Sequence, residues 1–208
     1  MGTREMRIGL DFDNTIAGYD SVFFGAARTR GFLDDDFCGG KRDIRDAIQL
    51  LPGGEKKWQE LQGSVYGSLI ESAEVIDGVA EFLTICKERR LPVAVVSHKT
   101  EFGHYDPDRV NLREAARSWM NDNGFFSKTG FGIPPEDVYF EDDRHNKIAR
   151  IREIGCSHFV DDLEEVFLDP SFPEDVEAIL FAGTSEKAPV GPFLTCRTWC
   201  EISDAILG

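Results

Sequence analysis

Short apolar runs and amphipathic segments alternate along most of this chain. Five runs of strand length are nearly continuously apolar, and several of them end in acidic or hydroxyl side chains. They lie at residues 6–13, 92–97, 138–142, 157–162 and 178–183. Runs of this kind predict strands that are buried on both faces, as the strands of a parallel sheet are.

Segments with helical periodicity separate these strands. Residues 77–90 have one apolar face and are followed by Pro92, which ends a helix, and further helices are predicted over residues 111–124 and 146–154. The alternation predicts an α/β fold, a Rossmann-like three-layer sandwich in which helices cover both faces of a central parallel sheet. Ligands of such sheets bind at the carboxyl ends of the strands.

A long polar and aromatic region follows the first strand. Residues 17–72 contain amphipathic helical patches, for example around Trp58, and predict a small helical cap inserted into the core. The expected organisation is therefore a core formed by residues 1–16 and 73–208 and a cap formed by residues 17–72.

Composition narrows the class of protein and its partners. The 208 residues include 23 Lys and Arg against 38 Asp and Glu, a net charge of −15 that disfavours nucleic acid and anionic membranes as partners. The amino terminus is short and polar and no run of 18 apolar residues follows, so neither a signal peptide nor a membrane span is expected. Five cysteines, an odd number, fit a reducing compartment. We expect a cytoplasmic protein whose oligomeric state is unknown.

The first strand ends in Asp11-Phe12-Asp13-Asn14-Thr15. Residues i and i+2 of a strand point the same way, so both carboxylates would face one cleft. Two acids at this spacing can divide the chemistry: one is ionised beside a cation and acts as a nucleophile, and the other keeps a proton for a leaving group. The alternative is a solvated turn that closes the strand, because Asp and Asn are common in turns.

The second strand ends at Ser97, which His98 and Lys99 follow. A hydroxyl beside exposed backbone N–H groups can hold phosphate oxygens, and the two basic side chains can add positive charge. A serine that ends a strand is also an ordinary feature without a function. A Ser–His nucleophile pair is not expected, because adjacent residues on a strand point to opposite faces.

Lys147 lies near the start of a predicted helix, and Asp161 and Asp162 end the fourth strand. A lysine in a first helical turn opposes the helix macrodipole, so nearby anions such as Asp11, Asp162 and a bound phosphoryl group would account for it. Converging acids repel each other without a cation, and their oxygens suit Mg²⁺. An exposed lysine on a polar face, and a turn or helix N-cap at the strand end, are the alternatives.

In chain order, these features are an apolar run ending in DxDxT, a strand-terminal Ser, a Lys, and an apolar run ending in Asp-Asp. This order resembles the four motifs of the haloacid dehalogenase (HAD) superfamily of phosphohydrolases. The resemblance runs from Ile8 to Asp162, whereas the cap region and the C-terminal segment match no known pattern. It implies that the first strand lies between the second and the fourth, which would bring Asp11, Ser97 and Asp162 together.

The resemblance implies a phosphatase that acts through an aspartyl-phosphate intermediate. Asp11 would attack phosphorus, and Asp13 would protonate the leaving alcohol and then activate water. Ser97 would hold the phosphoryl oxygens, and Lys147 would neutralise the nucleophile and the phosphate. Family members that cleave carbon–halogen bonds lack the second acid of the first motif, so Asp13 indicates a phosphate ester as the substrate.

The cofactor that the resemblance implies is Mg²⁺, bound by Asp11, by the backbone carbonyl of Asp13 and by the Asp161-Asp162 pair, directly or through water. This pair departs from the commoner Gly-Asp-x-x-x-Asp form of the last motif. Alignment with that form favours Asp162 over Asp161 as the direct ligand.

Substrate selection is expected to depend on the cap and on loops at the strand ends. The candidate substrate-binding residues are Thr15, His98, Lys99 and Arg144. If Lys99 or Arg144 supplies local positive charge, its alanine variant would have a raised KM. Aromatic and basic side chains of the cap are further candidates for contacts with the leaving group of the substrate. Packing between helices explains the aromatic residues more simply, and exposure to solvent explains the basic ones. These candidates are Phe23, Phe24, Arg28, Lys41, Arg42 and Arg45.

A small cap favours a small-molecule phosphate ester, either a nucleotide, as in small-capped nucleotidases, or a sugar phosphate. The sequence does not decide between them. A non-catalytic or regulatory module that binds metal or phosphate on the same fold is an alternative, although every catalytic position holds the right residue type. A protein phosphatase is a third possibility, against which the cap and the acidic surface count.

Overall fold

The computed structural model describes residues 6–34, 36–105, 108–183 and 189–208. The chain divides into two compact units. The first consists of residues 1–17, 75–99 and 123–208, and the second of residues 18–74 and 100–122. No helix in the described part of the chain is both long enough and apolar enough to cross a membrane.

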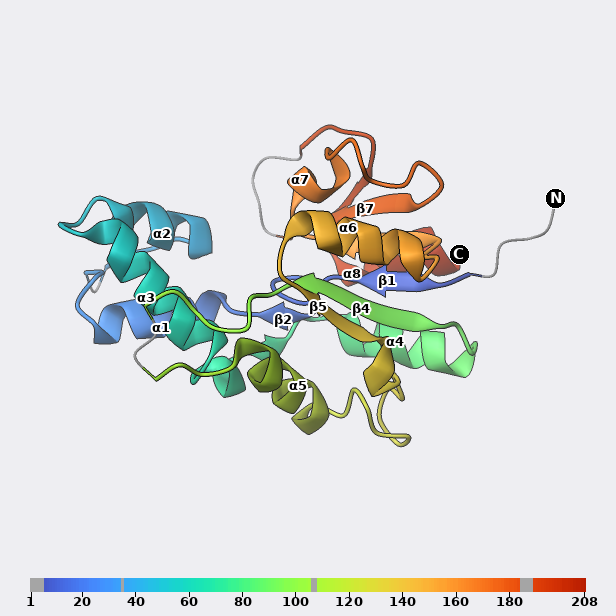
Figure 1. Ribbon diagram of the computed structural model, residues 1–208, viewed down its shortest axis with the longest axis horizontal. Coiled ribbons are helices and arrows are strands. Elements are labelled where there is room, and N and C mark those ends of the chain that lie inside the picture. The colour runs from blue at the N-terminus through green and yellow to red at the C-terminus, as the bar shows by residue number, and fades with distance from the viewer. Residues whose placement is uncertain (1–5, 35, 106–107, 184–188) are drawn as a thin grey trace. The chain divides into compact units, whose positions relative to one another are not determined.

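A six-stranded sheet forms the centre of the first unit, in the order β5-β4-β1-β6-β7-β8, and every neighbouring pair of strands is parallel (Figure 1). The strands are β1 (Ile8–Leu10), β4 (Val93–His98), β5 (Val138–Glu141), β6 (His158–Asp161), β7 (Glu177–Phe181) and β8 (Leu194–Cys196). The predicted α/β fold with a central parallel sheet is confirmed. The first strand lies between the second and fourth predicted strands, now β4 and β6, as the family resemblance implied.

Helices cover both faces of this sheet (Figure 1). On one face, α6 (Arg144–Glu153) and α7 (Glu164–Phe167) pack through Ile148, Ile151 and Phe167 onto a buried apolar cluster that includes Phe159 of β6. On the other face, α4 (Val79–Glu88) and α8 (Trp199–Leu207) contact each other. A short 3₁₀ helix, η2 (Pro135–Asp137), leads into β5.

Gly9 in the middle of β1 shows why this central strand contains a glycine. A Cβ atom at this position would lie 2.5 Å from Cδ2 of Phe159 and 2.7 Å from Sγ of Cys156, far closer than carbon atoms pack. The missing side chain lets the cluster under α6 and α7 approach the backbone of β1. The packing of Phe159 and Cys156 against Gly9 therefore holds in place the strand that leads into the DxDxT motif.

The C-terminal segment, for which the sequence indicated no role, completes the core. Thr198 caps α8 by accepting a hydrogen bond from the N–H of Glu201 at 3.2 Å, and Trp199 follows, buried against the ring of Phe82 at 5.1 Å between centroids. The indole Nε1–H of Trp199 donates to the carbonyl of Thr15 at 3.1 Å. The last helix therefore stabilises the loop that follows the first strand.

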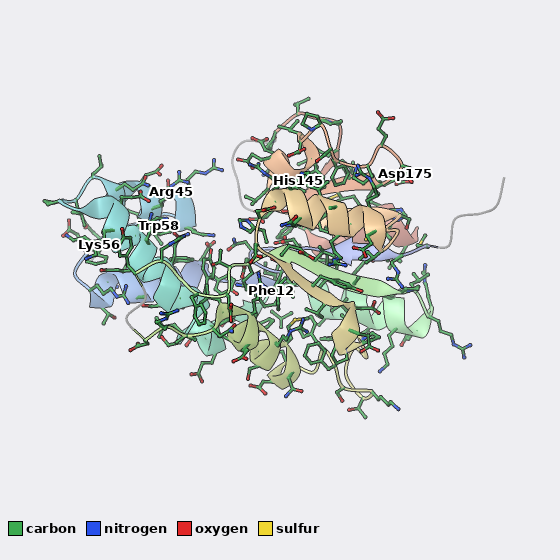
Figure 2. All side chains as sticks on the ribbon, in the orientation of Figure 1. Phe12, Arg45, Lys56, Trp58, His145 and Asp175 are labelled. Carbon is green, nitrogen blue, oxygen red and sulfur yellow. The ribbon has the colours of Figure 1, made fainter. Side chains whose placement is uncertain are left out.

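The second unit is helical, with α1 (Asp20–Thr29), α2 (Lys41–Gln49), α3 (Gly54–Tyr66), η1 (Ile70–Ser72) and α5 (Leu112–Asp122). A separate two-stranded sheet pairs β2 (Ala17–Gly18) with β3 (Glu74–Val75). Trp58 points inward, whereas Lys56 projects outward from the same helix (Figure 2).

Helix α5 groups with residues 18–74, although the sequence assigned it to the core. Its Trp119 donates a hydrogen bond from Nε1 to the carbonyl of Ala73 at 2.9 Å. An amphipathic helix shows which face is buried but not which neighbour covers that face, so periodicity alone did not indicate this grouping.

Candidate active site

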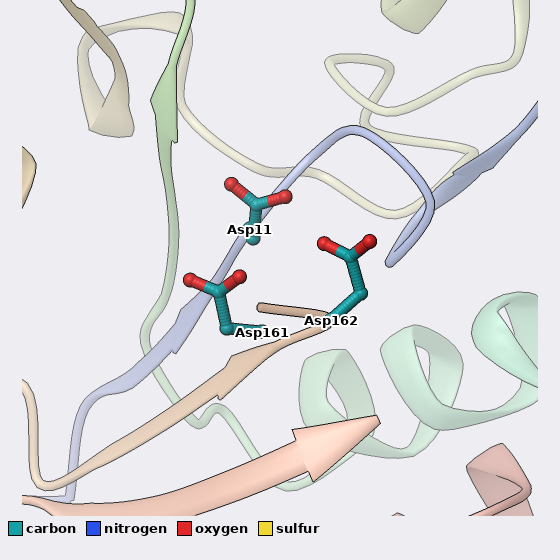
Figure 3. A group of neighbouring side chains, drawn as sticks. All are labelled: Asp11, Asp161 and Asp162. Carbon is teal, nitrogen blue, oxygen red and sulfur yellow. The ribbon is translucent and has the colours of Figure 1, made fainter. Parts of the chain in front are cut away.

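Asp11 follows directly on β1 at the carboxyl edge of the sheet, and its side chain faces Asp161 and Asp162 (Figure 3). The register explains this: Leu10 is paired with Val160, and the N–H of Asp11 continues the ladder to the carbonyl of Val160 at 2.9 Å. One carboxylate oxygen from each of the three acids lies within 4.8 Å of the others. The two strand ends that the sequence singled out as acidic therefore form one cluster.

Lys147 neutralises the deepest part of this cluster. Its Nζ lies 2.6 Å from Oδ1 of Asp11 and 2.7 Å from Oδ2 of Asp161. The Asp143 carboxylate caps α6 by accepting from the N–H of Asn146 at 2.7 Å, so the helix starts at Arg144, two residues earlier than predicted. Asp11 and Asp162 were the carboxylates expected beside Lys147. The structure pairs Lys147 with Asp11 and, as the second carboxylate, with Asp161.

Burial and charge compete in this cluster. Burial acts to lower the pKa of Lys147, but the adjacent carboxylates of Asp11 and Asp161 outweigh it and raise this pKa above its ordinary value. Burial raises the pKa of Asp161, the ammonium of Lys147 opposes that rise, and the charge of Asp11 adds to it. One lysine therefore does not fully offset the charge of the buried carboxylates, which makes the cluster attractive to a further cation.

Asp161 and Asp162 have different surroundings. Oδ1 of Asp161 accepts the N–H of Leu163 at 3.0 Å and Oδ2 faces Lys147, and the side chain is fully buried. Asp162 is only partly buried. Oδ1 of Asp161 is therefore hydrogen-bonded, and Oδ2 lies beside the Lys147 ammonium but has no hydrogen-bond partner among the described residues. Asp162 is the more accessible acid of the pair.

Asp13 forms an ion pair with a second lysine, Lys99. Nζ of Lys99 lies 3.0 Å from Oδ1 of Asp13 and 2.9 Å from Oδ2. A tight turn presents Asp13: the carbonyl of Phe12 accepts from the N–H groups of Ile16 and Ala17, both at 3.0 Å. The sequence identified Lys99 as a candidate substrate-binding residue, and the structure pairs it with the second acid of the motif.

The remaining predicted site residues differ in exposure. Ser97 is buried at the end of β4, and His98 next to it is exposed, which agrees with the expected alternation and with the rejection of a Ser–His pair. The Thr15 hydroxyl is fully buried and has no hydrogen-bond partner among the described residues. Arg144 is exposed, and its Nη1 lies 3.4 Å from the carbonyl of Glu165.

The candidate residues in residues 17–72 mostly have partners within their own unit. Phe23 is fully buried and stacks on Trp58 at 5.1 Å between ring centroids. Arg28 lies over Phe24, Lys41 lies over Phe23, and Arg45 is paired with the neighbouring Asp46. Arg42 is exposed. These contacts show how the second unit packs and assign none of these residues to a ligand.

Comparisons with known proteins agree with this geometry. No protein-family model matches the chain. The 2-hydroxy-3-keto-5-methylthiopentenyl-1-phosphate phosphatase of Geobacillus kaustophilus is 28% identical over 132 residues, and the match covers 61% of this chain and 58% of that protein. The chain therefore spans less than two thirds of the length of this relative.

Solved structures with the same fold cover nearly the whole chain. Protein Tyrosine Kinase A of Mycobacterium tuberculosis has a TM-score of 0.60 at 15% identity, with all of both chains covered. The HAD-hydrolase YfnB of Bacillus subtilis, described as bound to magnesium, has a TM-score of 0.58 at 12% identity, with 98% of this chain and 99% of that chain covered. This chain has the fold of the HAD-superfamily hydrolases.

Proposed function

We propose that this protein is a Mg²⁺-dependent phosphatase that hydrolyses a small phosphomonoester through an aspartyl-phosphate intermediate. One observation carries the proposal: Asp11 lies at the carboxyl edge of the sheet, 2.6 Å from Lys147, in a cluster with Asp161 and Asp162. A buried carboxylate beside one cation and two further acids has the surroundings of an activated oxygen nucleophile. The G. kaustophilus relative is named as a phosphatase, which supports the same reaction class.

The acidic cluster fits a hard divalent cation. Three carboxylates offer oxygen atoms within 4.8 Å of one another, and Mg²⁺ prefers oxygen ligands. In our proposal Asp11, Asp162 and the backbone carbonyl of Asp13 hold the ion, and Asp161 supports the site through Lys147. The bound ion supplies charge neutralisation for the phosphoryl group and its nucleophile.

The proposed reaction has two halves, and residues of this chain act in both. In the first, a carboxylate oxygen of Asp11 forms a bond to phosphorus while the bond from phosphorus to the ester oxygen breaks, and Asp13 gives a proton to the leaving alcohol. In the second, Asp13 takes a proton from water, the water oxygen attacks phosphorus, and the bond to Asp11 breaks. Inorganic phosphate leaves and Asp11 is regenerated.

Ser97 and Lys147 hold the phosphoryl group during both halves. Ser97 is the second-last residue of β4, the strand next to β1, and we propose that its hydroxyl donates to phosphoryl oxygens. Lys147 is already beside Asp11, so it neutralises charge that builds up between nucleophile and phosphate without having to move. Thr15, His98 and Arg144 stay candidates for contacts with the rest of the substrate.

The second compact unit is proposed to be the cap that selects this substrate. Its sequence segments are inserted after the first motif and after Lys99, and connecting segments of this kind often carry binding residues. Nucleotides and sugar phosphates are the substrate classes to test, and a cytoplasmic location without nucleic-acid or membrane partners is part of the proposal, in keeping with the acidic composition.

Phosphate release from a panel of nucleotides, sugar phosphates and aryl phosphates tests this proposal. Wild type should release phosphate with Mg²⁺ and not with EDTA, and Asp11→Asn should lower kcat by at least about 1,000-fold, because the amide is not a nucleophile. Asp36→Asn, a change in an acid outside the cluster, is the matched control. Activity that persists in Asp11→Asn would refute the assigned nucleophile.

A further inference from the structure

We propose that Lys99 is a positioning residue that holds the Asp13 carboxylate in its working orientation, and that it does not bind the substrate phosphate. This inference rests on the proposed phosphatase function. It assigns Lys99 a different task from the substrate contact that its basic side chain first suggested. The two alternatives predict different kinetics.

The contact between the two side chains is close and two-sided. Nζ of Lys99 lies 3.0 Å from one oxygen of Asp13 and 2.9 Å from the other, so the ammonium faces the whole carboxylate. The Lys99 side chain is 2% exposed and that of Asp13 is 18% exposed. A buried ammonium held against both oxygens fixes the plane of the carboxylate while one edge of Asp13 stays accessible.

The elements under this pair are rigid. The N–H of Lys99 donates to the carbonyl of Glu141 at 2.9 Å, which extends the ladder between β4 and β5 beyond the end of β4. Nζ of Lys99 lies 5.5 Å from the centre of the Phe12 ring, and Phe12 is fully buried with its ring edge-on to Phe140.

The strand pattern places Lys99 and Asp13 on neighbouring strand ends. Lys99 is two residues after Ser97, as Asp13 is two residues after Asp11, and β1 and β4 are adjacent and parallel. Residues i and i+2 share a face of an extended chain, which explains why Ser97 and Lys99 are buried while His98 between them is exposed. Each working residue of the first motif thus has a partner: Lys147 for Asp11 and Lys99 for Asp13.

This geometry predicts that Lys99 acts on the reaction only through Asp13. A poor leaving group needs the proton that Asp13 supplies, whereas a good leaving group departs without it. Loss of Lys99 should therefore resemble loss of Asp13, with a large effect on phenyl phosphate and a small one on 2,4-dinitrophenyl phosphate. A residue that bound the phosphate would affect both substrates equally, because both carry the same phosphoryl group.

The test compares kcat/KM for these two substrates in wild type, Lys99→Met, Asp13→Asn and the double variant. We expect Lys99→Met to lower kcat/KM about 10-fold to 100-fold for phenyl phosphate and less than about 5-fold for 2,4-dinitrophenyl phosphate. Asp13→Asn should show the same pattern with a larger loss. The double variant should be no slower than Asp13→Asn alone, because Lys99 has no task once the carboxylate is gone.

Controls separate positioning from stability and from general charge. Lys128→Met makes the same substitution at an exposed lysine and should leave both rates unchanged. The rise in melting temperature on adding Mg²⁺ should be equal in Lys99→Met and wild type, because the carboxylate that pairs with Lys99, that of Asp13, is not one of the three clustered acids. Should Lys99→Met fold poorly, Lys99→Arg replaces it, since a guanidinium can also donate to both oxygens and should restore part of the rate.

Three outcomes would overturn the inference. Equal losses of kcat/KM for both substrates in Lys99→Met would assign Lys99 to the phosphoryl group. If the losses of the two single variants multiplied in the double variant, Lys99 would act independently of Asp13. An unchanged or raised kcat/KM in Lys99→Met would show that Lys99 does not position Asp13. A wild type that is inactive on every substrate would refute the proposed function and this role with it. If wild type is active and Lys99→Met has the same kcat/KM as wild type, only the positioning role is refuted.

Discussion

The two lysine–aspartate pairs at the carboxyl edge of the sheet are built differently. Lys147 is shared between Asp11 and Asp161, and all three side chains are at most 6% exposed. Lys99 is paired with Asp13, whose side chain is 18% exposed. One lysine belongs to a buried cluster with excess negative charge, and the other contacts an acid that is partly exposed to solvent.

This difference indicates two separate tasks for positive charge in one site. A buried cluster needs its cation for stability as well as for chemistry, because an uncompensated charge in the interior is costly. A partly exposed carboxylate can be solvated when its partner is removed, so its lysine matters mainly for orientation. The first two of the following predictions separate these tasks.

Lys147→Met should have the largest effect. It leaves Asp11 and Asp161 buried without a cation, which costs about 3 to 5 kcal/mol of folding free energy. For a chain of this size, that corresponds to a fall in melting temperature of about 6 to 20 °C. Thermal unfolding in EDTA measures it.

Lys99→Met is the matched comparison for that experiment, because it removes the same group from a more exposed pair. Its melting temperature should fall by clearly less. Equal falls in the two variants would contradict the distinction between a structural and an orienting lysine.

The metal dependence of stability should distinguish Asp162 from Asp161. Mg²⁺ at about 100 times its Kd should stabilise wild type by about 2.7 kcal/mol, or about 5 to 11 °C in melting temperature. Asp162→Asn should keep the melting temperature in EDTA and lose most of this rise, because the more accessible acid holds the ion directly. Asp161→Asn should lower the melting temperature in EDTA, since Lys147 loses a partner. A full Mg²⁺ response in Asp162→Asn would reverse the two assignments.

A smaller effect is expected from Trp199, which connects the last helix to the motif loop. Trp199→Phe removes the hydrogen bond from Nε1 to the carbonyl of Thr15 and should cost about 1 kcal/mol, or about 2 to 4 °C. Because Thr15 follows Asp13 by two residues, kcat/KM should also fall, by about 3-fold to 10-fold.

Trp119→Phe is the control for this change. It loses the same kind of bond, from Nε1 to the carbonyl of Ala73, within the second unit. Its stability should fall by a similar amount. If Trp199→Phe changed stability without changing the rate, the last helix would have no part in positioning the motif.

The sequence was sufficient to predict five of the six strands of the central sheet and the acids at their ends, but not β8. Buried parallel strands are short apolar runs, and the runs at residues 92–97 and 157–162 match β4 and β6 closely. Their order in the sheet came from the family resemblance. The side chains at the strand ends followed from the alternation of residues along a strand, which holds for Ser97 and His98.

The contacts between elements could not be predicted from these patterns. Adjacent residues at a strand end point to opposite faces, so whether Lys147 meets Asp161 or Asp162 depends on how α6 packs against the sheet, and the sequence pattern does not show that. Likewise, β8 and α8 carry no motif, so their contribution to the loop after the first strand became visible only in the packing of Trp199. Composition and periodicity do not encode such long-range neighbours.

The most direct test of the whole account is to trap the covalent intermediate. Wild type mixed with 2,4-dinitrophenyl phosphate and Mg²⁺ is quenched in acid within milliseconds, digested and analysed by mass spectrometry. We expect one phosphoryl group on the peptide that contains Asp11, labile to mild alkali and absent from Asp11→Asn. Turnover without any phosphorylated peptide, or a phosphoryl group on a different residue, would contradict the central claim that Asp11 is the nucleophile.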